Sequence, residues 1–260
     1  MNLAENFSKE LVVAIDASDA AAKLIRSYFK GNFIVDIKED MTPVTEVDIK
    51  AENTIKEIIM NAFPDYGFYG EETCRENKNS EYTWLVDPID GTKGFVRGYP
   101  FFSTQIALMH HDEIILGVSN APIFDEIIFA EKGKGAWMNN KQIHISHTKD
   151  IVSSTISTGN LKTIAQSENW KNLGKIVSKA DRIRGYGDFY HYHLLASGKI
   201  DVVIESDVNI LDVAALSLII EESGGVFTDF QGKRSNLDTT SVIASNPILY
   251  SSIKKELIGN

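Results

Sequence analysis

Apolar side chains recur at helical spacing in the first sixty residues of the chain. Between residues 3 and 30 they fall on or near one repeating face, with small alanines between them: Phe7, Leu11, Ile15, Leu24 and Phe29. A second face spans residues 46–61 and consists of Val47, Ala51, Ile55, Ile58 and Ile59. Pro64 and Asp65 then interrupt the pattern. The sequence therefore predicts one helix over residues 3–30 and another over 46–61.

Shorter apolar runs, typical of strands, fill the middle of the chain. They lie at residues 66–70, 83–87, 103–109, 113–121 and 126–138. Because no helix-length pattern separates the last three, we expect them to form an antiparallel meander. Gly133, Gly135 and the pair Asn139–Asn140 are the expected turns.

The pattern changes near residue 150, after which short apolar runs alternate with helix-like segments. The apolar runs lie at residues 154–159, 182–187, 199–205, 226–230 and 241–245. The helix-like segments lie at residues 169–180, 188–198 and 211–225. Such alternation is typical of an α/β arrangement. We therefore expect an N-terminal α+β half, residues 1–150, and a C-terminal α/β half, residues 151–260, that share an interface because no long linker separates them.

Charge and cysteine content narrow the class of protein. The 260 residues include 26 Lys plus Arg and 36 Asp plus Glu, a formal net charge of −10. This balance argues against a nucleic-acid surface, which needs clustered cations, but allows a small phosphorylated metabolite bound at a local site. Cys74 is the single cysteine, so no intrachain disulfide can form. The longest apolar run near the N terminus, residues 11–15, is too short for a signal peptide or a membrane span. These features predict a cytoplasmic protein with no membrane partner.

Two aspartates, Asp87 and Asp90, flank Pro88 in the stretch TWLVDPIDGTKGF. Asp87 closes a predicted strand, and Pro88 fixes φ so that both carboxylates point into one small volume. Like charges so close repel, and a divalent cation between them relieves the repulsion. Gly91 lets the backbone approach a ligand, and Thr92 offers a hydroxyl and an N–H for an anion. The stretch indicates metal-assisted phosphoryl transfer, and its structural alternative is a plain turn that caps a helix.

Three other acidic features are candidates for the same site. They are Asp48 in VTEVD, Glu71–Glu72 in YGEET and Asp212 in NILDVAAL. Asp48 is alternatively a first-turn helix residue, and Asp212 is alternatively a helix cap. For Glu72 we prefer a cap or an ion pair with a nearby cation. Lys38 either contacts phosphate or is a solvated charge.

Three motifs together resemble the inositol monophosphatase superfamily. They are GEE at residues 70–72, WLVDPIDGTKGF at 84–95 and LDVAAL at 211–216, the last followed by EESGG. The resemblance extends over nearly the whole chain, from VTEVD to SVIASN. It implies a layered α-β-α-β-α sandwich and a Mg²⁺-dependent phosphomonoesterase that uses two or three ions.

The resemblance also implies residue roles. The expected ligands of Mg²⁺ are Glu71, Asp87, Asp90, Asp212 and the backbone carbonyl of Ile89. Asp90 and Asp212 are expected to bind a second Mg²⁺ ion and to line the substrate site. Two metals about 3.5–4 Å apart can activate the nucleophile and stabilise the leaving oxygen together, so no histidine is required.

The nucleophile and the phosphate have their own expected partners. Glu71 and Thr92 orient the attacking water, and the N–H groups of Gly91 and Thr92 bind phosphate oxygens. Asp48 supports Thr92 through a hydrogen bond or through water at the metal.

Residues 184–212 are expected to select the phosphate ester. Asp188 follows a glycine where inositol-type members usually carry small neutral residues, and the segment that begins there resembles the histidinol-phosphatase branch. Asp188 and Glu205 are candidates to pair with the ammonium group of L-histidinol phosphate. Asp188 is alternatively the N-cap of the next helix. Asn209 and Leu211 replace the His and Trp of inositol types, which weakens an inositol assignment.

Other functions stay open. Inositol-1-phosphate is the runner-up substrate. A 3′(2′),5′-bisphosphate nucleotide is the third, since Arg184 and Tyr186 offer a cation and a stacking surface. The non-enzymatic alternative is a metal-binding pseudo-phosphatase, although no expected ligand is missing. The sequence has no GxSxG motif and no complete EF-hand loop. The family often forms homodimers, and we extend that expectation to this chain.

Overall fold

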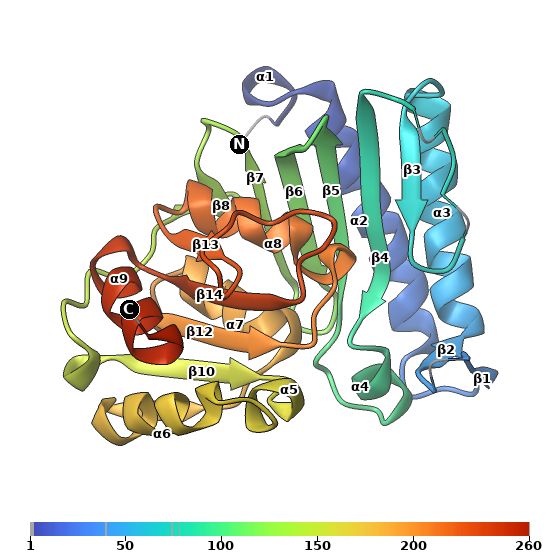
Figure 1. Ribbon diagram of the computed structural model, residues 1–260. Helices are drawn as coiled ribbons and strands as arrows, with labels where there is room; N and C mark the ends of the chain where they lie inside the picture. Colours follow the sequence, from blue (N-terminus) through green and yellow to red (C-terminus); the bar gives the residue numbers. More distant parts are fainter. Residues whose placement is uncertain (1–2, 40, 74, 78, 260) are drawn as a thin grey trace.

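The structure, a computed structural model, describes residues 3–39, 41–73, 75–77 and 79–259. Its helices and strands stack in five layers in the order α-β-α-β-α, which confirms the fold that the resemblance implied (Figure 1). Cys74, the basis of the disulfide argument, lies outside the described residues. Among the helices that the structure describes, none is long and apolar enough to cross a membrane.

A seven-stranded sheet forms the second layer, in the order β3-β4-β5-β6-β7-β8-β9. β3 and β4 are parallel, and the other neighbours are antiparallel, which confirms the expected meander. A turn that contains Gly133 and Gly135 splits the predicted run 126–138 into two strands. The strands are β3 (Gly67–Gly70), β4 (Tyr82–Asp90), β5 (Ser103–His110), β6 (Glu113–Ala121), β7 (Glu126–Glu131), β8 (Ala136–Met138) and β9 (Lys141–Ile143).

Helices α2 (Lys9–Tyr28) and α3 (Glu46–Ala62) cover the outer face of this sheet. The prediction of one helix over residues 3–30 is wrong, because α1 (Leu3–Asn6) ends before α2 begins. Ser8 has extended backbone angles and caps α2, since its Oγ accepts a hydrogen bond from the N–H of Leu11 (3.2 Å). Its own N–H donates to Glu131 Oε2 (2.9 Å). The predicted helix over residues 46–61 is confirmed as α3.

A five-stranded sheet forms the fourth layer, in the order β11-β10-β12-β14-β13. Its strands are β10 (Thr155–Gly159), β11 (Arg182–Arg184), β12 (Val202–Ser206), β13 (Val226–Thr228) and β14 (Ser241–Ser245). Alternate residues of β12 enter different cores: Val202 and Ile204 pack toward the outer helices, and Val203 packs toward the middle layer. The outer helical elements are η1 (Ile151–Ser153), α5 (Lys162–Ala165), α6 (Asn169–Lys179) and α9 (Pro247–Ile258).

Two helices, α7 (Asp188–Ala196) and α8 (Ile210–Glu222), form the middle layer. α8 is apolar around nearly its whole circumference, as expected for a helix packed between two sheets. It packs closely against β6 because Gly117 has no side chain at the contact. The short helix α4 (Thr92–Val96) follows β4 directly, so the end of β4 and the start of α8 meet where the two sheets adjoin.

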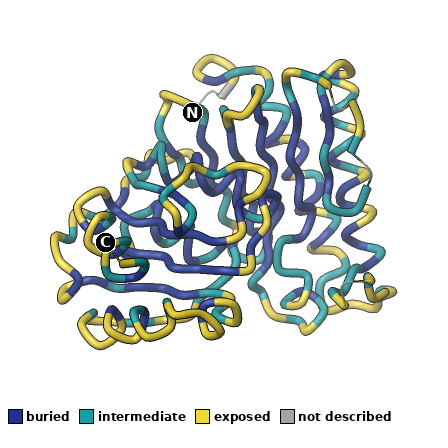
Figure 2. The backbone as a smooth tube through the Cα atoms, in the orientation of Figure 1, coloured by how far each residue is buried: buried dark blue, intermediate teal, exposed yellow. Residues whose placement is uncertain are grey.

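A small hairpin of β1 (Val35–Ile37) and β2 (Pro43–Thr45) leads into α3. All three residues of β1 are exposed. The hairpin lies at the lower right of Figure 1 and of Figure 2, which share one orientation. Because β1 buries neither face, it lacks the alternation that marks a half-buried strand, and the sequence pattern did not predict it.

Candidate functional site

Asp87 and Asp90 lie three residues apart on β4, and their carboxylates converge because the strand bulges between them. Asp87 pairs with Gln105 and Asp90 with Ser103, so β4 has one residue more than β5 over this interval. Residues three apart in a regular strand face opposite sides of the sheet, and one extra residue restores the same side. The expectation that the strand ends at Asp87 is wrong, but the expected convergence is confirmed.

Hydrogen bonds fix the shape of this bulge. Thr104 Oγ1, buried on β5, donates to the carbonyl oxygen of Pro88 (2.9 Å). The N–H of Ile89 donates to Asp87 Oδ1 (3.0 Å). The Ile89 carbonyl, an expected metal ligand, lies 3.0 Å from the hydroxyl oxygen of Thr92. The bulge is therefore held by both neighbouring elements, β5 and α4.

Asp212 reaches the same place from the first turn of α8. One carboxylate oxygen from each of Asp87, Asp90 and Asp212 lies within 4.8 Å of the other two. Asp212 Oδ2 also accepts a hydrogen bond from the N–H of Asn209 (2.9 Å), which is the N-cap of α8. Asp212 therefore stabilises the helix end without being its cap, and it still directs a carboxylate oxygen toward the other two aspartates.

Lys38 bridges the β1–β2 hairpin to the residues that follow β3. Its Nζ donates to Glu71 Oε1 (3.0 Å) and to Glu72 Oε1 (2.7 Å). Burial lowers the pKa of Lys38, but the hydrogen bonds and charges of the two glutamates outweigh it and raise the pKa. The ion-pair interpretation of Glu72 is confirmed, and the alternative of Lys38 as a solvated charge is wrong.

The four acidic residues Glu71, Asp87, Asp90 and Asp212, here called the carboxylate cluster, repel one another. Burial raises the pKa of Asp87, and the charge of Glu71 adds to the effect. Burial also raises the pKa of Asp212, to about 7, and Glu71 again contributes. A cation bound between these oxygens relieves the repulsion. Because every side-chain donor is a carboxylate oxygen, the cluster suits a divalent metal ion.

Asp48 is buried next to the carboxylate cluster and contacts Thr92. Asp48 Oδ1 lies 3.1 Å from Thr92 Oγ1, and Asp48 Oδ2 accepts a hydrogen bond from the N–H of Thr45 (2.8 Å). Asp48 is the third residue of α3 and completes a capping box with Thr45. The interpretation of Asp48 as a residue of the first helical turn and its expected hydrogen bond to Thr92 are therefore both confirmed.

Gly91 lets the chain turn from β4 into α4. Its φ is 93°, in the left-handed region that favours glycine, and a Cβ there would lie 2.6 Å from the carbonyl oxygen of Phe101. The first turn of α4 therefore starts directly beside Asp90, with the N–H groups of Gly91 and Thr92 at its beginning.

Asp188 lies close enough to Asp90 for their charges to interact, although 98 positions separate them in the sequence. After burial, the charge of Asp188 is the largest cause that raises the pKa of Asp90. Burial and the charge of Glu205 raise the pKa of Asp188 to about 6. The alternative of Asp188 as a helix N-cap is wrong: Gly187 is the N-cap of α7, and Asp188 is its first residue, with φ of 44°.

Glu205, buried on β12, is bound by side chains of α7. Its Oε2 accepts a hydrogen bond from the hydroxyl of Tyr192 (2.7 Å) and lies 3.1 Å from His191 Nε2. Its Oε1 takes a longer bond from Asn160 Nδ2 (3.4 Å). Sequence reasoning missed Tyr192 and His191 as partners of Glu205. The sequence signal that could have revealed them is the polar run HYH at residues 191–193 of a mostly apolar helix, because buried polar groups need hydrogen-bond partners.

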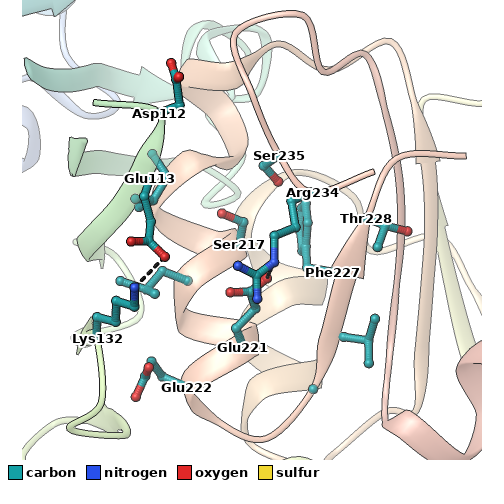
Figure 3. Close-up of a pocket in the computed structure, with 14 residues that line it drawn as sticks. Asp112, Glu113, Lys132, Ser217, Glu221, Glu222, Phe227, Thr228, Arg234 and Ser235 are labelled. Carbon is teal, nitrogen blue, oxygen red and sulfur yellow. Dashed lines mark hydrogen bonds and ion pairs between the residues drawn. The ribbon is translucent and has the colours of Figure 1, made fainter. Parts of the chain in front are cut away.

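A cavity of about 560 Å³ lies at the other end of α8 (Figure 3). Glu113 and Lys132 form an ion pair at one side, and Arg234 extends toward Glu221 from the other, with 3.7 Å between its Nε and Glu221 Oε1. None of the described residues that line this cavity belongs to the carboxylate cluster. It is therefore separate from the candidate site.

The chain is similar to known proteins over nearly its whole length. The model of the inositol monophosphatase family matches residues 7–259. The chain is 34% identical to a histidinol-phosphatase from Chlorobaculum parvum, over 91% of this chain and 92% of that protein. It is 32% identical to an inositol-1-monophosphatase from Mesorhizobium japonicum, over 86% of each. The crystal structure of the extragenic suppressor protein suhB from Bartonella henselae superposes with a TM-score of 0.90, at 29% identity, over 96% of this chain and 98% of that one.

Proposed function

The chain belongs to the inositol monophosphatase family and is a phosphoric monoester hydrolase, and we propose that it uses Mg²⁺ to hydrolyse L-histidinol phosphate. The observation that carries the substrate proposal is that the charge of Asp188, the first residue of α7, acts on Asp90 in the carboxylate cluster. An ammonium group near the reacting phosphate would pair with a carboxylate at that place. The likeness to a protein named histidinol-phosphatase supports the same choice.

The carboxylate cluster would hold the metal. Asp87, Asp90 and Asp212 offer oxygens within 4.8 Å of one another, and Glu71 is close enough to raise the pKa of Asp87. Oxygen donors of this kind, together with phosphate oxygens, are what Mg²⁺ prefers. When bound, the metal would neutralise charge on the phosphate and on the leaving oxygen.

Thr92 and Glu71 would orient the attacking water. Thr92 has a single hydroxyl proton, which goes to buried Asp48 at 3.1 Å or to the Ile89 carbonyl oxygen at 3.0 Å, so Oγ1 keeps a lone pair that can accept a hydrogen bond from water. Glu71 supplies a second acceptor. The water oxygen then bonds to phosphorus while the bond from phosphorus to the ester oxygen breaks. The alcohol leaves with one proton, and inorganic phosphate is the other product.

A substrate panel tests the proposal. Purified protein is assayed for phosphate release with Mg²⁺ and each of L-histidinol phosphate, inositol-1-phosphate and 3′-phosphoadenosine 5′-phosphate. We expect the highest kcat/KM with L-histidinol phosphate. A preference for inositol-1-phosphate, the substrate class of the Mesorhizobium japonicum relative, or for the nucleotide would overturn the substrate assignment. No turnover of any ester would favour the metal-binding pseudo-phosphatase.

A further inference from the structure

Three side chains of types that can bind a metal ion, Glu81, His110 and His111, converge far from the carboxylate cluster. One ligand atom from each lies within 4.8 Å of the other two. We propose that this group, here called the histidine cluster, is a second metal site that binds Zn²⁺ or a similar late transition-metal ion. Nothing in this proposal depends on the substrate of the enzyme.

The pairing of β4 with β5 brings the three residues together. Tyr82, the first residue of β4, pairs with His110, the last residue of β5, so Glu81 lies next to the β5–β6 turn. The N–H of His111 donates to the carbonyl oxygen of Glu81 (2.7 Å). Successive strand side chains face opposite ways, but His111 has left strand geometry, with φ of 53°. Its ring consequently lies beside that of His110, with 4.4 Å between the ring centroids.

A column of stacked rings holds His110 in place. The rings of Tyr66 and Tyr82 stack at 4.8 Å with 13° between their planes, and those of Tyr82 and His110 stack at 4.3 Å with 10°. The hydroxyl of Tyr66 is itself anchored by Glu10 (3.1 Å). The His110 ring is therefore positioned by packing before any ion arrives, which lowers the entropic cost of binding.

The donor set distinguishes this site from the carboxylate cluster. Two imidazoles and one carboxylate are typical zinc ligands, and three protein ligands leave a fourth position open for water. Imidazole suits late transition metals, whereas a set made only of carboxylates suits Mg²⁺. The two sites also lie at opposite ends of β4, roughly 25 Å apart at the usual rise per strand residue. Figure 1 shows β4 running from the top of its sheet down to α4; Glu81 immediately precedes this strand, and Asp90 is its last residue.

Zinc titration in the presence of excess Mg²⁺ tests the proposal, since Mg²⁺ would occupy the carboxylate cluster under the function proposed above. Competition with a chromophoric chelator gives the stoichiometry and affinity of Zn²⁺ for wild-type protein and for the double variant His110→Gln/His111→Gln. Two other exposed histidines, His144 and His147, provide the matched control His144→Gln/His147→Gln. We expect one Zn²⁺ per chain in wild type and in the control. In the double variant we expect affinity at least about tenfold weaker, because even groups that only support a metal ligand are worth 10–100-fold.

Two further measurements separate the loss of a metal ligand from a general loss of folded structure. Zn²⁺ should raise the Tm of wild type and of the control but not of the double variant, because an ion that binds the folded state stabilises it. Glu81→Gln should weaken Zn²⁺ binding while circular dichroism stays unchanged. Equal zinc affinity in wild type and the double variant would overturn the proposal, as would the absence of any zinc binding beyond the site that Mg²⁺ blocks.

Discussion

The backbone of Ala215 on α8 lies against Gly117 on β6 so closely that a Cβ on residue 117 would be 2.5 Å from the Ala215 carbonyl oxygen. Real Cβ atoms do not approach backbone this closely, so glycine sets the spacing between helix and sheet. Asp212 lies one turn before Ala215 on the same helix. The spacing at Gly117 therefore also sets how near Asp212 comes to Asp87 and Asp90.

Gly117→Ala should weaken both stability and metal binding. The added methyl group has to push α8 away from β6, and overpacking of this kind costs about 1–3 kcal/mol. Because α8 carries Asp212, Mg²⁺ affinity should fall as well. Urea unfolding measures the free energy of unfolding, and isothermal titration measures the affinity.

Gly174→Ala is the matched control for Gly117→Ala. Gly174 lies in α6, and a Cβ there meets nothing within 4 Å. This variant should be as stable as wild type or more stable, by up to about 1 kcal/mol, because alanine loses less conformational freedom in a helix. If Gly117→Ala bound Mg²⁺ as tightly as Gly174→Ala, the spacing of α8 would not control the site.

Asp90→Asn should remove nearly all phosphatase activity while the fold stays intact. Asp90 lies within reach of both Asp87 and Asp212, so losing its charge weakens every ion held there. Supporting groups of a metal site are worth 10–100-fold, so loss of a ligand should lower kcat by at least about 100-fold. Phosphate-release kinetics and circular dichroism measure the two expectations, with the exposed Asp181→Asn as control. An active Asp90→Asn enzyme would contradict the metal assignment.

The sequence around Pro88 predicted that Asp87 and Asp90 converge, and the family resemblance implied that Asp212 joins them. The sequence did not predict how they meet. The bulge on β4 is defined by its register against Gln105 and Ser103, and nothing within TWLVDPIDGTKGF shows that register.

Other features escaped prediction because they depend on contacts between distant segments. The break before α2 needs Glu131, which accepts a hydrogen bond from the N–H of Ser8. The role of Gly117 depends on α8, and the ring column at His110 depends on Tyr66 and Tyr82 meeting across two strands. Local pattern determined most elements, whereas pairing and packing determined the site geometry.

The stability of metal-free protein should fall as pH rises from about 4 to 7. Asp212 has a pKa of about 7 in the folded protein, raised first by burial, against an ordinary value of 3.8. Between these values the folded state holds a proton that the unfolded state has lost. The free energy of unfolding therefore decreases with pH, and the contribution is complete below pH 4 and absent above 7. Urea unfolding in a chelator at several pH values measures this slope.

The variant Asp212→Asn isolates that contribution. Its amide carries no charge, so the difference in stability between the variant and wild type should grow as pH rises toward 7. Excess Mg²⁺ should shrink the difference, since the ion binds the folded wild type. Parallel curves for the two proteins in chelator would show that Asp212 titrates normally.

The choice of substitution at Asp188 matters because of its backbone. Its φ of 44° lies in the left-handed region, which asparagine tolerates and alanine adopts at a cost of roughly 1–2 kcal/mol. Asp188→Asn therefore removes the charge with little backbone strain, whereas Asp188→Ala changes both. Comparing the two separates an electrostatic role from a structural one.

Asp188→Asn should lower kcat/KM for L-histidinol phosphate far more than for inositol-1-phosphate. The carboxylate would pair with the ammonium group of the first ester, and the second has no cation to pair with it. A charge-assisted hydrogen bond is worth about 1.5–3 kcal/mol, which corresponds to a loss of roughly 10–150-fold. Steady-state phosphate release with both esters measures the ratio, and Asp188→Ala should show the same selectivity on top of any general loss. Equal losses on both esters would reduce Asp188 to a residue that shapes the start of α7.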